Sequence, residues 1–511
     1  MNMNKQIKAL GAFLVVCYVA LFIKLNQTQI VDADKLNADP NNARPVQREF
    51  NRARGQIISA DGVVLARSVA PTDEGDLTSP RVREYPEGDL FGQITGYYSW
   101  KYLATGVEKT YNDALLGRTF DQQIRGLSDL FSNNENVGNV TLTVNRELQA
   151  YAREVFHGPR GEQVQGAVVA IDPKSGAILA MWSNPSFDPT LMVQGTSDQL
   201  ETNKALLELA PGKPLRSKAF QERYSPGSTM KIVTGGIGLE TGKVTNEDPV
   251  YPDVTSIRPP RTTQDLSNFS GETCGGALPL IMTRSCNTSF AEMGFKTVGE
   301  ADMVNGAQQW GFNSSPPLDI DGAVQSVFPP KSAEEPAFLA QMAIGQFDVQ
   351  ATPLTMALAA GAAANGGTVM TPHVMRDIRN SEGQVVTTYQ PAPWLQAMSP
   401  DKAEILKQDL YGPVYGCCGF TGTAQGFVNV PAPYKAGGKT GTAQVDPINR
   451  PGIVNAWFTG FAGPENGEPQ VAVAAVVLEQ GGANNDATGG QVAGPIVSNV
   501  MNKALEILNR K

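Results

Sequence analysis

The sequence predicts an α+β fold in which a helical lobe packs against an antiparallel sheet. Two apolar runs within residues 166–183 flank the turn sequence DPKSG, which indicates a β-hairpin. A mostly helical stretch over about 225–410 follows, and strand-like runs then lead to a helix over 490–508. Strands, then helices, then further strands closed by one helix are typical of an α+β domain.

An N-terminal apolar segment predicts a membrane anchor. Residues 9–23 carry no charge and lie between Lys8 and Lys24. This run is shorter than the roughly 20 residues that a span needs, but the flanking lysines can extend their amines to the interfaces. A cleaved signal peptide and a buried helix are the alternatives. We expect a cytoplasmic stub and anchor over 1–33, with the rest of the chain on the extracytoplasmic side by the positive-inside rule.

The next part of the chain predicts a smaller domain before the main one. Residues 34–50 are polar and are interpreted as a linker or an extended entry strand. Residues 54–70 hold two short apolar runs around an Asp-Gly turn. Residues 139–156 begin as a strand and continue as a helix. We therefore expect an N-terminal domain over 34–160 and the main α+β domain over 161–511.

The strands that end the main domain are expected from three C-terminal runs. These runs are KAGGKTGTAQV, AWFTGFAG and VAVAAVVLE, at 435–445, 456–463 and 471–479. We expect these runs to be strands of one sheet that the helix over 490–508 closes.

Composition excludes some functions. The net charge is −9, the isoelectric point is about 5.1, and no cluster of Lys and Arg is present, so we expect no nucleic-acid partner. Cys274, Cys286, Cys417 and Cys418 follow the anchor, and an even number of cysteines in an oxidising compartment permits disulfides in three pairings. Only two histidines occur and no C-x-x-C, so we expect no metal site.

The central motif is Ser228-Thr-Met-Lys231, which follows a Pro-Gly turn. On a helix, residues three apart lie on one face about 5–6 Å apart, so the lysine amine can reach the serine hydroxyl. A desolvated lysine of lowered pKa can take the proton of a serine and make it a nucleophile. A second S-x-x-K, Ser399 to Lys402, has a simpler interpretation as a helix N-cap followed by Pro at the first helical position.

Two further motifs follow in order. Ser285-Cys286-Asn287 lies 57 residues after Ser228, and Lys439-Thr440-Gly441-Thr442 lies 154 residues after Ser285. Each motif is common by chance, and the matches at 132–134 and 174–176 are interpreted as a polar loop and a hairpin turn. The ordered set is the informative feature.

This ordered set resembles the motifs of the penicillin-recognising serine transpeptidases. Residues 54–57 (RGQI) and 106–117 (GVEKTYNDALLG) resemble the N-terminal pedestal motifs of class B penicillin-binding proteins. Residues 166–189, 344–367 and 456–463 resemble their transpeptidase domain. The resemblance covers nearly the whole chain, and within this class the short actinobacterial elongation- or division-type enzymes are the most similar.

The resemblance implies a role for each motif. Ser228 would attack the penultimate D-alanyl carbonyl of a peptidoglycan stem peptide, and Lys231 would be the general base. Ser285 would pass a proton to the leaving amine, and Asn287 would hold the substrate amide and Lys231. Backbone N–H groups of Ser228 and Thr442 would form the oxyanion hole.

The third motif is expected to hold the substrate carboxylate. Lys439 would supply the positive charge, and Thr440 and Thr442 would offer hydroxyls, with Gly441 between them. β-Lactams would acylate the same serine, and no cofactor is implied. The class also implies a membrane partner that polymerises glycan, a multi-span glycosyltransferase of the SEDS type.

The sequence TGTAQ occurs twice, at 421–425 and at 440–444. The first copy has Phe420 where the site needs a cation, and it follows Cys417-Cys418 closely. We expect this copy to be a loop, so that Lys439→Ala slows acylation by penicillin and Thr421→Ala does not.

One cysteine, Cys286, lies within the second motif. Because Cys286 is the middle residue of the second motif, we expect a Cys274–Cys286 disulfide that fixes the loop with Ser285 and Asn287. A buried free thiol is the alternative. Cys417 and Cys418 either form a vicinal disulfide or are free, and the sequence does not decide between these states.

Other functions remain as alternatives. A β-lactamase or a carboxypeptidase would keep the fold and use water as acceptor, and a non-catalytic envelope scaffold would need none of the complete motifs. A bifunctional class A enzyme is disfavoured because 34–138 is too short for a glycosyltransferase domain. A Ser-His-Asp hydrolase would need His157 or His373 beside a serine, and both histidines are expected to be structural.

Overall fold

The structure is a computed structural model that describes residues 3–28, 50, 53–69, 81–119, 137–446, 448–481 and 487–510. The chain forms two compact units, residues 1–53 with 69–82 and residues 54–68 with 83–511, and each is described by itself. The predicted linker, apart from Phe50, and the S-x-N match at 132–134 lie outside the described residues.

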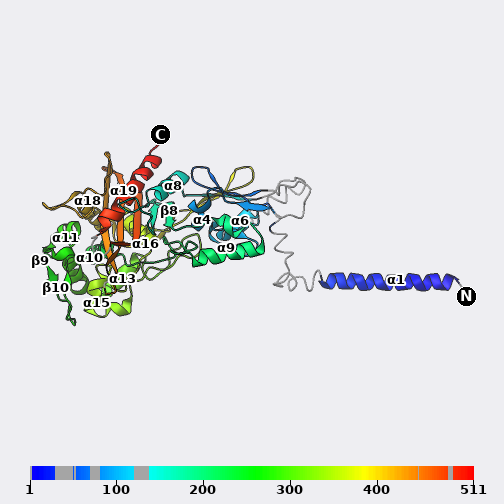
Figure 1. Ribbon diagram of the computed structural model, residues 1–511, viewed down its shortest axis with the longest axis horizontal. Coiled ribbons are helices and arrows are strands. Elements are labelled where there is room, and N and C mark those ends of the chain that lie inside the picture. Colours follow the sequence, from blue (N-terminus) through cyan, green and yellow to red (C-terminus); the bar gives the residue numbers. More distant parts are fainter. Residues whose placement is uncertain are drawn as a thin grey trace. The chain divides into compact units, whose positions relative to one another are not determined.

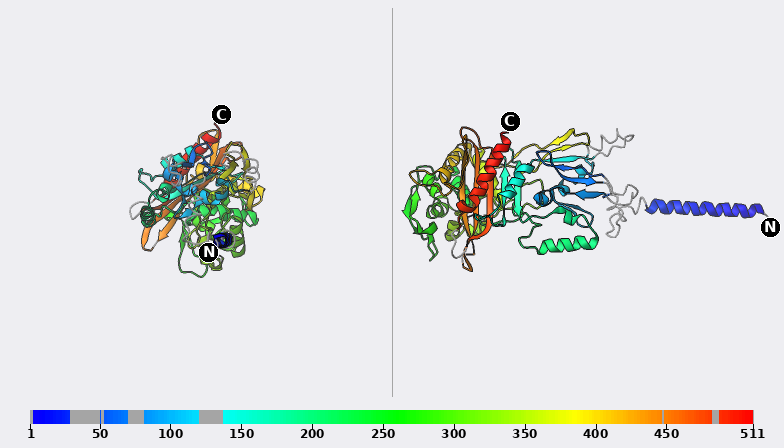
Figure 2. Two further views of the ribbon diagram at one scale, coloured as in Figure 1. Left: turned by 90° about the vertical axis from the view of Figure 1, so that its right-hand side faces the viewer. Right: turned by 45° about the horizontal axis from the view of Figure 1, so that its top comes forward.

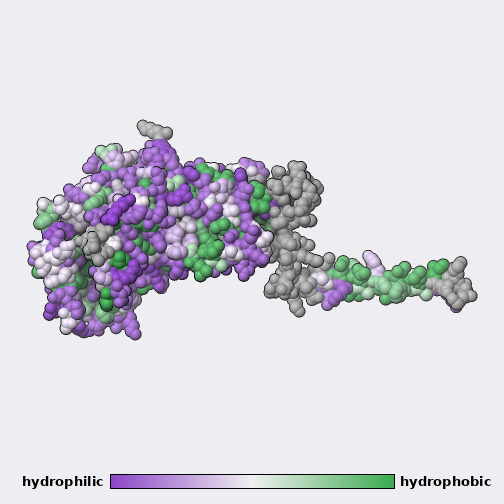
Figure 3. Space-filling model, in the orientation of Figure 1, coloured by the Kyte–Doolittle hydropathy of each residue, from purple (hydrophilic) through white to green (hydrophobic). Residues whose placement is uncertain are grey.

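In the first unit the principal element is helix α1, Met3–Asn26. Of the described residues, one stretch is long and apolar enough to cross a membrane, Ile7–Asn26, with 20 residues and a mean hydropathy of 2.1. In Figure 3 the visible face of the helix is mainly hydrophobic between its ends. The helix includes both lysines that bound the predicted run, and 20 residues at about 1.5 Å each suffice for a bilayer core. One N-terminal apolar helix therefore fits a single-pass anchor.

The second unit contains a six-stranded sheet in the order β15-β14-β6-β1-β2-β3. Its strands are β1 Ile57–Ile58, β2 Val64–Val69, β3 Val82–Glu84, β6 Asn139–Leu142, β14 Met375–Arg379 and β15 Val385–Thr388. The hairpin expected over 54–70 is the β1–β2 pair. Strands β14 and β15 arrive from far along the chain and pair with β6 and with each other, so two distant segments build this sheet.

Short elements surround this sheet. They are η2 Gly88–Leu90, α4 Gly92–Thr95, β4 Tyr98–Ser99, β5 Leu103–Ala104, α5 Gly106–Thr110, α6 Asn112–Leu115 and α8 Arg146–Glu154. Helix α8 begins where the sequence predicted a strand-to-helix change, and the side chain of Asn145 caps it by accepting from Leu148 N.

A buried ion cluster joins the two N-terminal motifs of the resemblance. Arg54 of RGQI and Arg83 donate to the two carboxylate oxygens of Glu108 at 2.7 and 2.6 Å. Burial alone would raise the pKa of Glu108, but the two guanidinium groups outweigh it and hold that pKa below its ordinary value. One buried charge network therefore connects the two motifs.

A five-stranded antiparallel sheet forms the centre of the main domain, in the order β17-β18-β19-β7-β8. Its strands are β7 Gly166–Ile171, β8 Ile178–Asn184, β17 Tyr434–Asp446, β18 Arg450–Pro464 and β19 Val471–Gly481. The first hairpin and the three C-terminal strands meet where β19 pairs with β7. The α+β class predicted from the sequence is confirmed.

Helices cover both faces of this sheet. Helix α19, Gly489–Leu508, and α8 pack on one face, whereas α16, Pro353–Ala364, packs on the other. Figure 1 and the right-hand view of Figure 2 show α19 crossing the strands. Helix α16 has no charged residue and is almost wholly buried, so it is the core helix between the sheet and the helical lobe.

The remaining helices form the lobe and its connections. They are η3 Pro189–Met192, α9 Ser197–Leu209, η4 Gly227–Met230, α10 Lys231–Glu240, η5 Phe269–Gly271, α11 Leu278–Arg284, α12 Asn287–Glu292, η6 Met293–Val298, α13 Glu300–Gln309, α14 Pro330–Ala333, α15 Pro336–Met342, α17 Pro400–Asp409 and α18 Gly412–Tyr415. Helix α10 is buried along nearly its whole length. A Cβ at its Gly236 would lie 2.3 Å from the Trp310 ring, so the glycine allows α10 and α13 to pack closely.

The middle region is less helical than the sequence predicted. Six short strands interrupt it besides β14 and β15: β9 Tyr251–Val254, β10 Ser256–Ile257, β11 Leu266–Ser267, β12 Cys274–Gly276, β13 Thr368–Met370 and β16 Pro393–Gln396. They pair only with one another, as two-stranded ribbons. Such short pairs leave no clear alternation in the sequence, which explains why they were missed.

Candidate active site

Ser228 lies in the turn η4, directly before α10. The preceding residue, Gly227, has φ +54, and a Cβ there would lie 3.0 Å from the carbonyl of Thr442. A Cβ on Gly345 would lie 2.1 Å from the Gly227 carbonyl oxygen. Glycines at these positions let the serine turn lie directly against strand β17.

Lys231 opens α10 and is fully buried. Its Nζ donates to the Ser285 carbonyl at 2.8 Å, to Ser285 Oγ at 3.1 Å and to Asn287 Oδ1 at 2.7 Å. The first and second motifs, far apart in the chain, are thus joined by three hydrogen bonds.

Ser285 occupies a strained turn between α11 and α12. It caps the C-terminus of α11 with φ +61 and ψ 44, a left-handed conformation that is unusual for serine. The turn is held by Cys286 N, which donates to the Ile281 carbonyl at 3.0 Å. The side chain of Asn287 donates to the Ser267 carbonyl at 3.1 Å. In this turn the Ser285 hydroxyl faces the amines of Lys231 and Lys439.

Lys439 is fully buried on β17, the edge strand of the five-stranded sheet. Its Nζ donates to Ser285 Oγ at 2.8 Å and to the carbonyl of Thr440 at 3.1 Å. Two amines, those of Lys231 and Lys439, therefore share one hydroxyl oxygen.

The rest of the third motif lies against the serine turn. A Cβ on Gly441 would lie 2.6 Å from the Pro226 carbonyl oxygen, so a larger residue would push the strand away. Thr442 Oγ1 accepts from Gly489 N at 3.1 Å, which leaves its own proton free to donate. Thr440 Oγ1 donates to Thr423 Oγ1 at 2.8 Å.

These groups surround a cavity of about 260 Å³. Its lining comes from all three motifs and from neighbouring loops: Ser228, Asn268, Phe269, Glu272, Cys274, Arg284, Ser285, Cys286, Asn287, Ile344, Gln346, Thr423, Thr440, Thr442, Thr488 and Gly490. The volume is close to the lower end of the range for small-molecule sites. Residues from all three motifs therefore share one cavity.

The electrostatics of the site favour a neutral amine. Burial, and then the charge of Lys439, lower the pKa of Lys231 well below its ordinary value. Burial lowers the pKa of Lys439 to about 7. Neither amine forms an ion pair with a carboxylate of the described residues. At neutral pH one amine can accept a proton from a serine hydroxyl.

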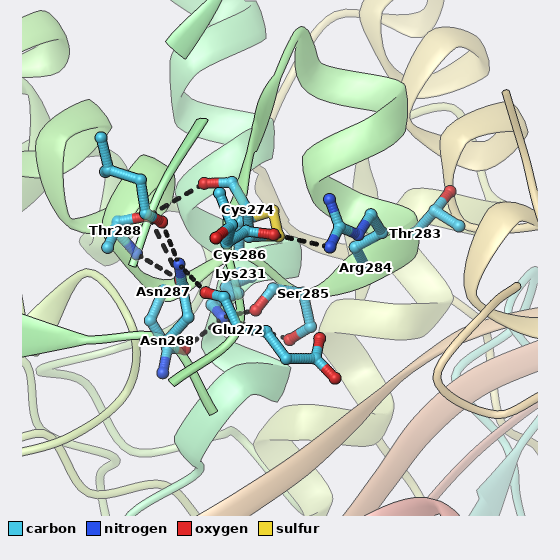
Figure 4. The surroundings of a disulfide bond; sticks show 12 residues. Lys231, Asn268, Glu272, Cys274, Thr283, Arg284, Ser285, Cys286, Asn287 and Thr288 are labelled. Atoms are coloured by element: carbon cyan, nitrogen blue, oxygen red, sulfur yellow. Dashed lines mark hydrogen bonds between the residues drawn. A yellow bond between two sulfur atoms is a disulfide. The ribbon is translucent and has the colours of Figure 1, made fainter. Parts of the chain in front are cut away.

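A disulfide joins Cys274 of β12 to Cys286. Figure 4 shows Lys231, Ser285 and Asn287 around it. Thr288 Oγ1 donates to the Cys274 carbonyl at 3.3 Å, so a side-chain hydrogen bond and the disulfide connect the same two segments. Cys417 and Cys418 are also paired with each other.

Two other motif matches, at 174–176 and 399–402, lie in the described residues, and only the first agrees fully with its interpretation. Ser175 lies in the β7–β8 turn, where its Oγ donates to Asp172 Oδ2 at 2.6 Å. Ser399 occupies the N-cap position of α17, but its side chain does not cap the helix. Instead Ser399 Oγ donates to Glu240 Oε2 at 2.8 Å. The sequence could not reveal this acceptor, which belongs to another helix.

Several site residues were missed by sequence reasoning. Thr423 and Thr488 line the cavity from loops, and Gln346 Nε2 donates to the Thr442 carbonyl at 3.4 Å. For Thr423 the available signal was the repeated TGTAQ, which was interpreted as a loop outside the site. The segment is a loop, but the cavity includes one of its side chains.

Two family descriptions match this chain. Residues 166–502 match "Penicillin binding protein transpeptidase domain", and residues 54–140 match "Penicillin binding protein A dimerisation domain". With the convergence of the three motifs, these matches establish that the chain belongs to the penicillin-binding proteins with a transpeptidase domain.

Known relatives refine this assignment. Peptidoglycan D,D-transpeptidase PbpA of Mycobacterium tuberculosis is 32% identical over 99% of both chains. The protein of that name in Mycolicibacterium smegmatis is 34% identical over 97% of both. A solved ceftriaxone acyl-enzyme complex of the M. tuberculosis penicillin-binding protein A has a TM-score of 0.80, 31% identity, and covers 90% of this chain and 99% of that one. The predicted class, class B and like the actinobacterial PbpA enzymes, is confirmed.

Proposed function

We propose that this chain is a peptidoglycan D,D-transpeptidase that acts through an acyl-enzyme on Ser228. The observation that carries the proposal is the meeting of two buried amines, from Lys231 and Lys439, on Ser285 Oγ at 3.1 and 2.8 Å. This arrangement lies beside Ser228 in one cavity. The printed activity of the PbpA relatives supports the same reaction.

Acylation begins with a proton transfer. A neutral Lys231 amine has two N–H donors, which serve Asn287 Oδ1 and the Ser285 carbonyl, and one lone pair, which accepts the Ser228 proton. Ser228 Oγ then attacks the penultimate D-alanyl carbonyl of a stem peptide. Backbone N–H groups of Ser228 and Thr442 stabilise the oxyanion.

The second motif completes the acyl transfer. Ser285 passes a proton, supplied by the lysine pair, to the nitrogen of the departing D-alanine. Asn287 holds both Lys231 and a substrate amide. The carboxylate of that D-alanine binds to Lys439 and Thr442 around Gly441, beside Thr440. An amine of a second stem peptide then attacks the ester, which forms the cross-link and frees Ser228.

β-Lactams enter the same cycle at its first step. Their ring carbonyl takes the place of the D-alanyl carbonyl, and their carboxylate takes the place of the terminal one. The amine that leaves the ring carbonyl stays attached to the acyl group. It therefore remains in the site and blocks attack of the acceptor amine on the ester. Benzylpenicillin is therefore the simplest probe of the site.

The related reactions differ in the acceptor. A carboxypeptidase or a β-lactamase would hydrolyse the acyl-enzyme with water, and a scaffold would not be acylated.

To test the proposal, the full-length protein in detergent is incubated with a D-Ala-D-Ala stem peptide, with and without an acceptor amine. Cross-linked product that requires Ser228 and the acceptor supports the proposal. Hydrolysis alone indicates a carboxypeptidase, and no D-alanine release contradicts the proposal.

We also propose bounds for the two domains. We propose a pedestal over 34–160 and a transpeptidase domain over 161–511, with β14 and β15 returning from the second to complete the sheet of the first. We also propose that α1 spans the membrane with Lys5 and Lys8 in the cytoplasm and the site outside.

A glycan-polymerising partner is needed because the proposed reaction makes no glycan. We propose a multi-span SEDS-type glycosyltransferase that contacts the membrane segment. A photo-crosslinking residue in α1 should capture such a protein in native membranes. Capture of lipid alone would contradict this partner.

A further inference from the structure

The two copies of TGTAQ meet in space. Thr440, the first residue of the second copy, donates from Oγ1 to Thr423 Oγ1, in the first copy, at 2.8 Å. Both threonines line the cavity with Ser228. The first copy is therefore part of the site wall, although it carries no lysine.

The loop around Thr423 is fixed on both sides. Ala424 is fully buried, and its N–H donates to the Pro413 carbonyl at 2.8 Å. A Cβ on Gly422 would lie 2.2 Å from the same carbonyl oxygen. Gly422 N donates to Gln425 Oε1 at 3.1 Å. Four residues of the copy thus have a defined role, whereas Thr421 is exposed.

A directed row of hydrogen bonds ends at Thr423. Lys439 Nζ donates to Thr440 Oγ1 at a long 3.4 Å, and Thr440 Oγ1 donates to Thr423 Oγ1 at 2.8 Å. The Thr440 proton is therefore engaged by protein. Within the described part of the chain, the proton of Thr423 has no acceptor at hydrogen-bonding distance. A hydroxyl with an unused proton on a cavity wall is a donor for a ligand.

We propose that Thr423 is a specificity-determining residue that donates a hydrogen bond to the carboxylate of the donor peptide or β-lactam. The inference rests on the proposed function for the identity of the ligand. Lys439 polarises the row from its other end, so the last donor in it suits an anion. Hydrogen bonds to a charged group are stronger than those between neutral groups.

A purely structural role predicts something different. If Thr423 only held the loop, its loss would weaken every ligand alike, with or without a carboxylate. A pair of ligands that differ only in this group separates the two roles. Benzylpenicillin and its methyl ester are such a pair.

The test compares three variants of the full chain in detergent. Thr423→Val removes the hydroxyl at nearly constant shape, Thr423→Ser keeps it, and Thr421→Val is the matched control in the same loop. We expect Thr423→Val to lower the second-order acylation constant for benzylpenicillin about 10- to 100-fold, as for a hydrogen bond to a charged group. For the methyl ester we expect a change of less than about 2-fold, and near wild-type constants for the other two variants.

Two outcomes would overturn the proposal. The first is an equal loss for benzylpenicillin and its ester with Thr423→Val, and the second is an equal loss with Thr421→Val. The dissociation constant of unreacted benzylpenicillin on the Ser228→Ala background gives the same comparison without acylation. Failure of wild-type acylation would therefore contradict the proposed function, whereas an unchanged dissociation constant on Thr423→Val would contradict this inference alone.

Discussion

Ser285 receives hydrogen bonds from two amines, and this is the residue-scale feature on which the proposed chemistry depends. Neither Lys231 nor Lys439 has a carboxylate partner within the described ranges, so burial acts on both without compensation. Their lowered pKa values mean that the pair carries fewer than two charges at neutral pH. One amine is then available as a base while the other attracts an anion.

The first residue-scale prediction concerns Lys439. Replacing it by alanine removes the cation that we propose holds the substrate carboxylate, and it removes a donor to Ser285 Oγ. We expect Lys439→Ala to slow acylation by benzylpenicillin by about 10²- to 10³-fold, comparable to losing an oxyanion donor. Thr421→Ala should acylate at the wild-type rate because Thr421 is exposed. Stopped-flow acylation measures both, and equal rates would refute the assignment.

The second prediction is a pH dependence. Lys439 has a pKa of about 7, so its positive charge is present below that pH and is lost above it. The second-order acylation constant for benzylpenicillin should therefore fall on the alkaline side with a midpoint near this value, since that constant reports the free enzyme. Benzylpenicillin methyl ester should not show this alkaline limb. The same limb with both compounds would contradict the role of Lys439.

At the scale of elements, the turn between α11 and α12 places Ser285 and Asn287 together. Its φ of +61 at Ser285 is costly for serine, and the Cys274–Cys286 disulfide closes the segment that carries it. The disulfide therefore limits the motions available to the strained turn that carries Ser285 and Asn287.

Removal of this disulfide gives the element-scale prediction. The double variant Cys274→Ser, Cys286→Ser opens a loop of sequence separation 12. Its free energy of unfolding should fall by about 3 kcal/mol on the loop-entropy model. The matched control is Cys417→Ser, Cys418→Ser, whose separation of 1 closes almost no chain. Urea unfolding of both variants is the measurement, and an equal loss in the control would contradict the account.

Particular elements show what the sequence could predict. The order of the three motifs identified Ser228, Lys231, Ser285, Asn287 and Lys439 as candidates because each motif is local. The β7–β8 hairpin was predicted because its turn residues are consecutive. Thr423 could not be assigned, because its contact with Thr440 depends on how two loops fold together. The same holds for the Glu240 acceptor of Ser399.

At the scale of the whole chain, two non-local features organise the second unit. Strands β14 and β15 leave the transpeptidase range and complete the sheet that begins with β1. The motifs RGQI and GVEKTYNDALLG meet at the Arg54–Glu108 pair. No pattern within either segment predicts these pairings.

The whole-molecule prediction tests that ion cluster. Glu108→Ala leaves Arg54 and Arg83 buried without their shared carboxylate. We expect the free energy of unfolding to fall by about 3–5 kcal/mol, the cost of breaking a buried pair. Arg67→Ala, which breaks the exposed pair with Glu84, should cost less than about 1 kcal/mol. A similar loss in both variants would contradict the importance of the buried network.

The central claim is that Ser228 is the nucleophile of this site. Full-length protein is treated with benzylpenicillin, and mass spectrometry of the intact protein and of its peptides locates the adduct. The account predicts one penicilloyl group on Ser228, absent from Ser228→Ala and retained by Ser399→Ala. An adduct on another residue, or no adduct on the folded wild-type protein, would contradict it.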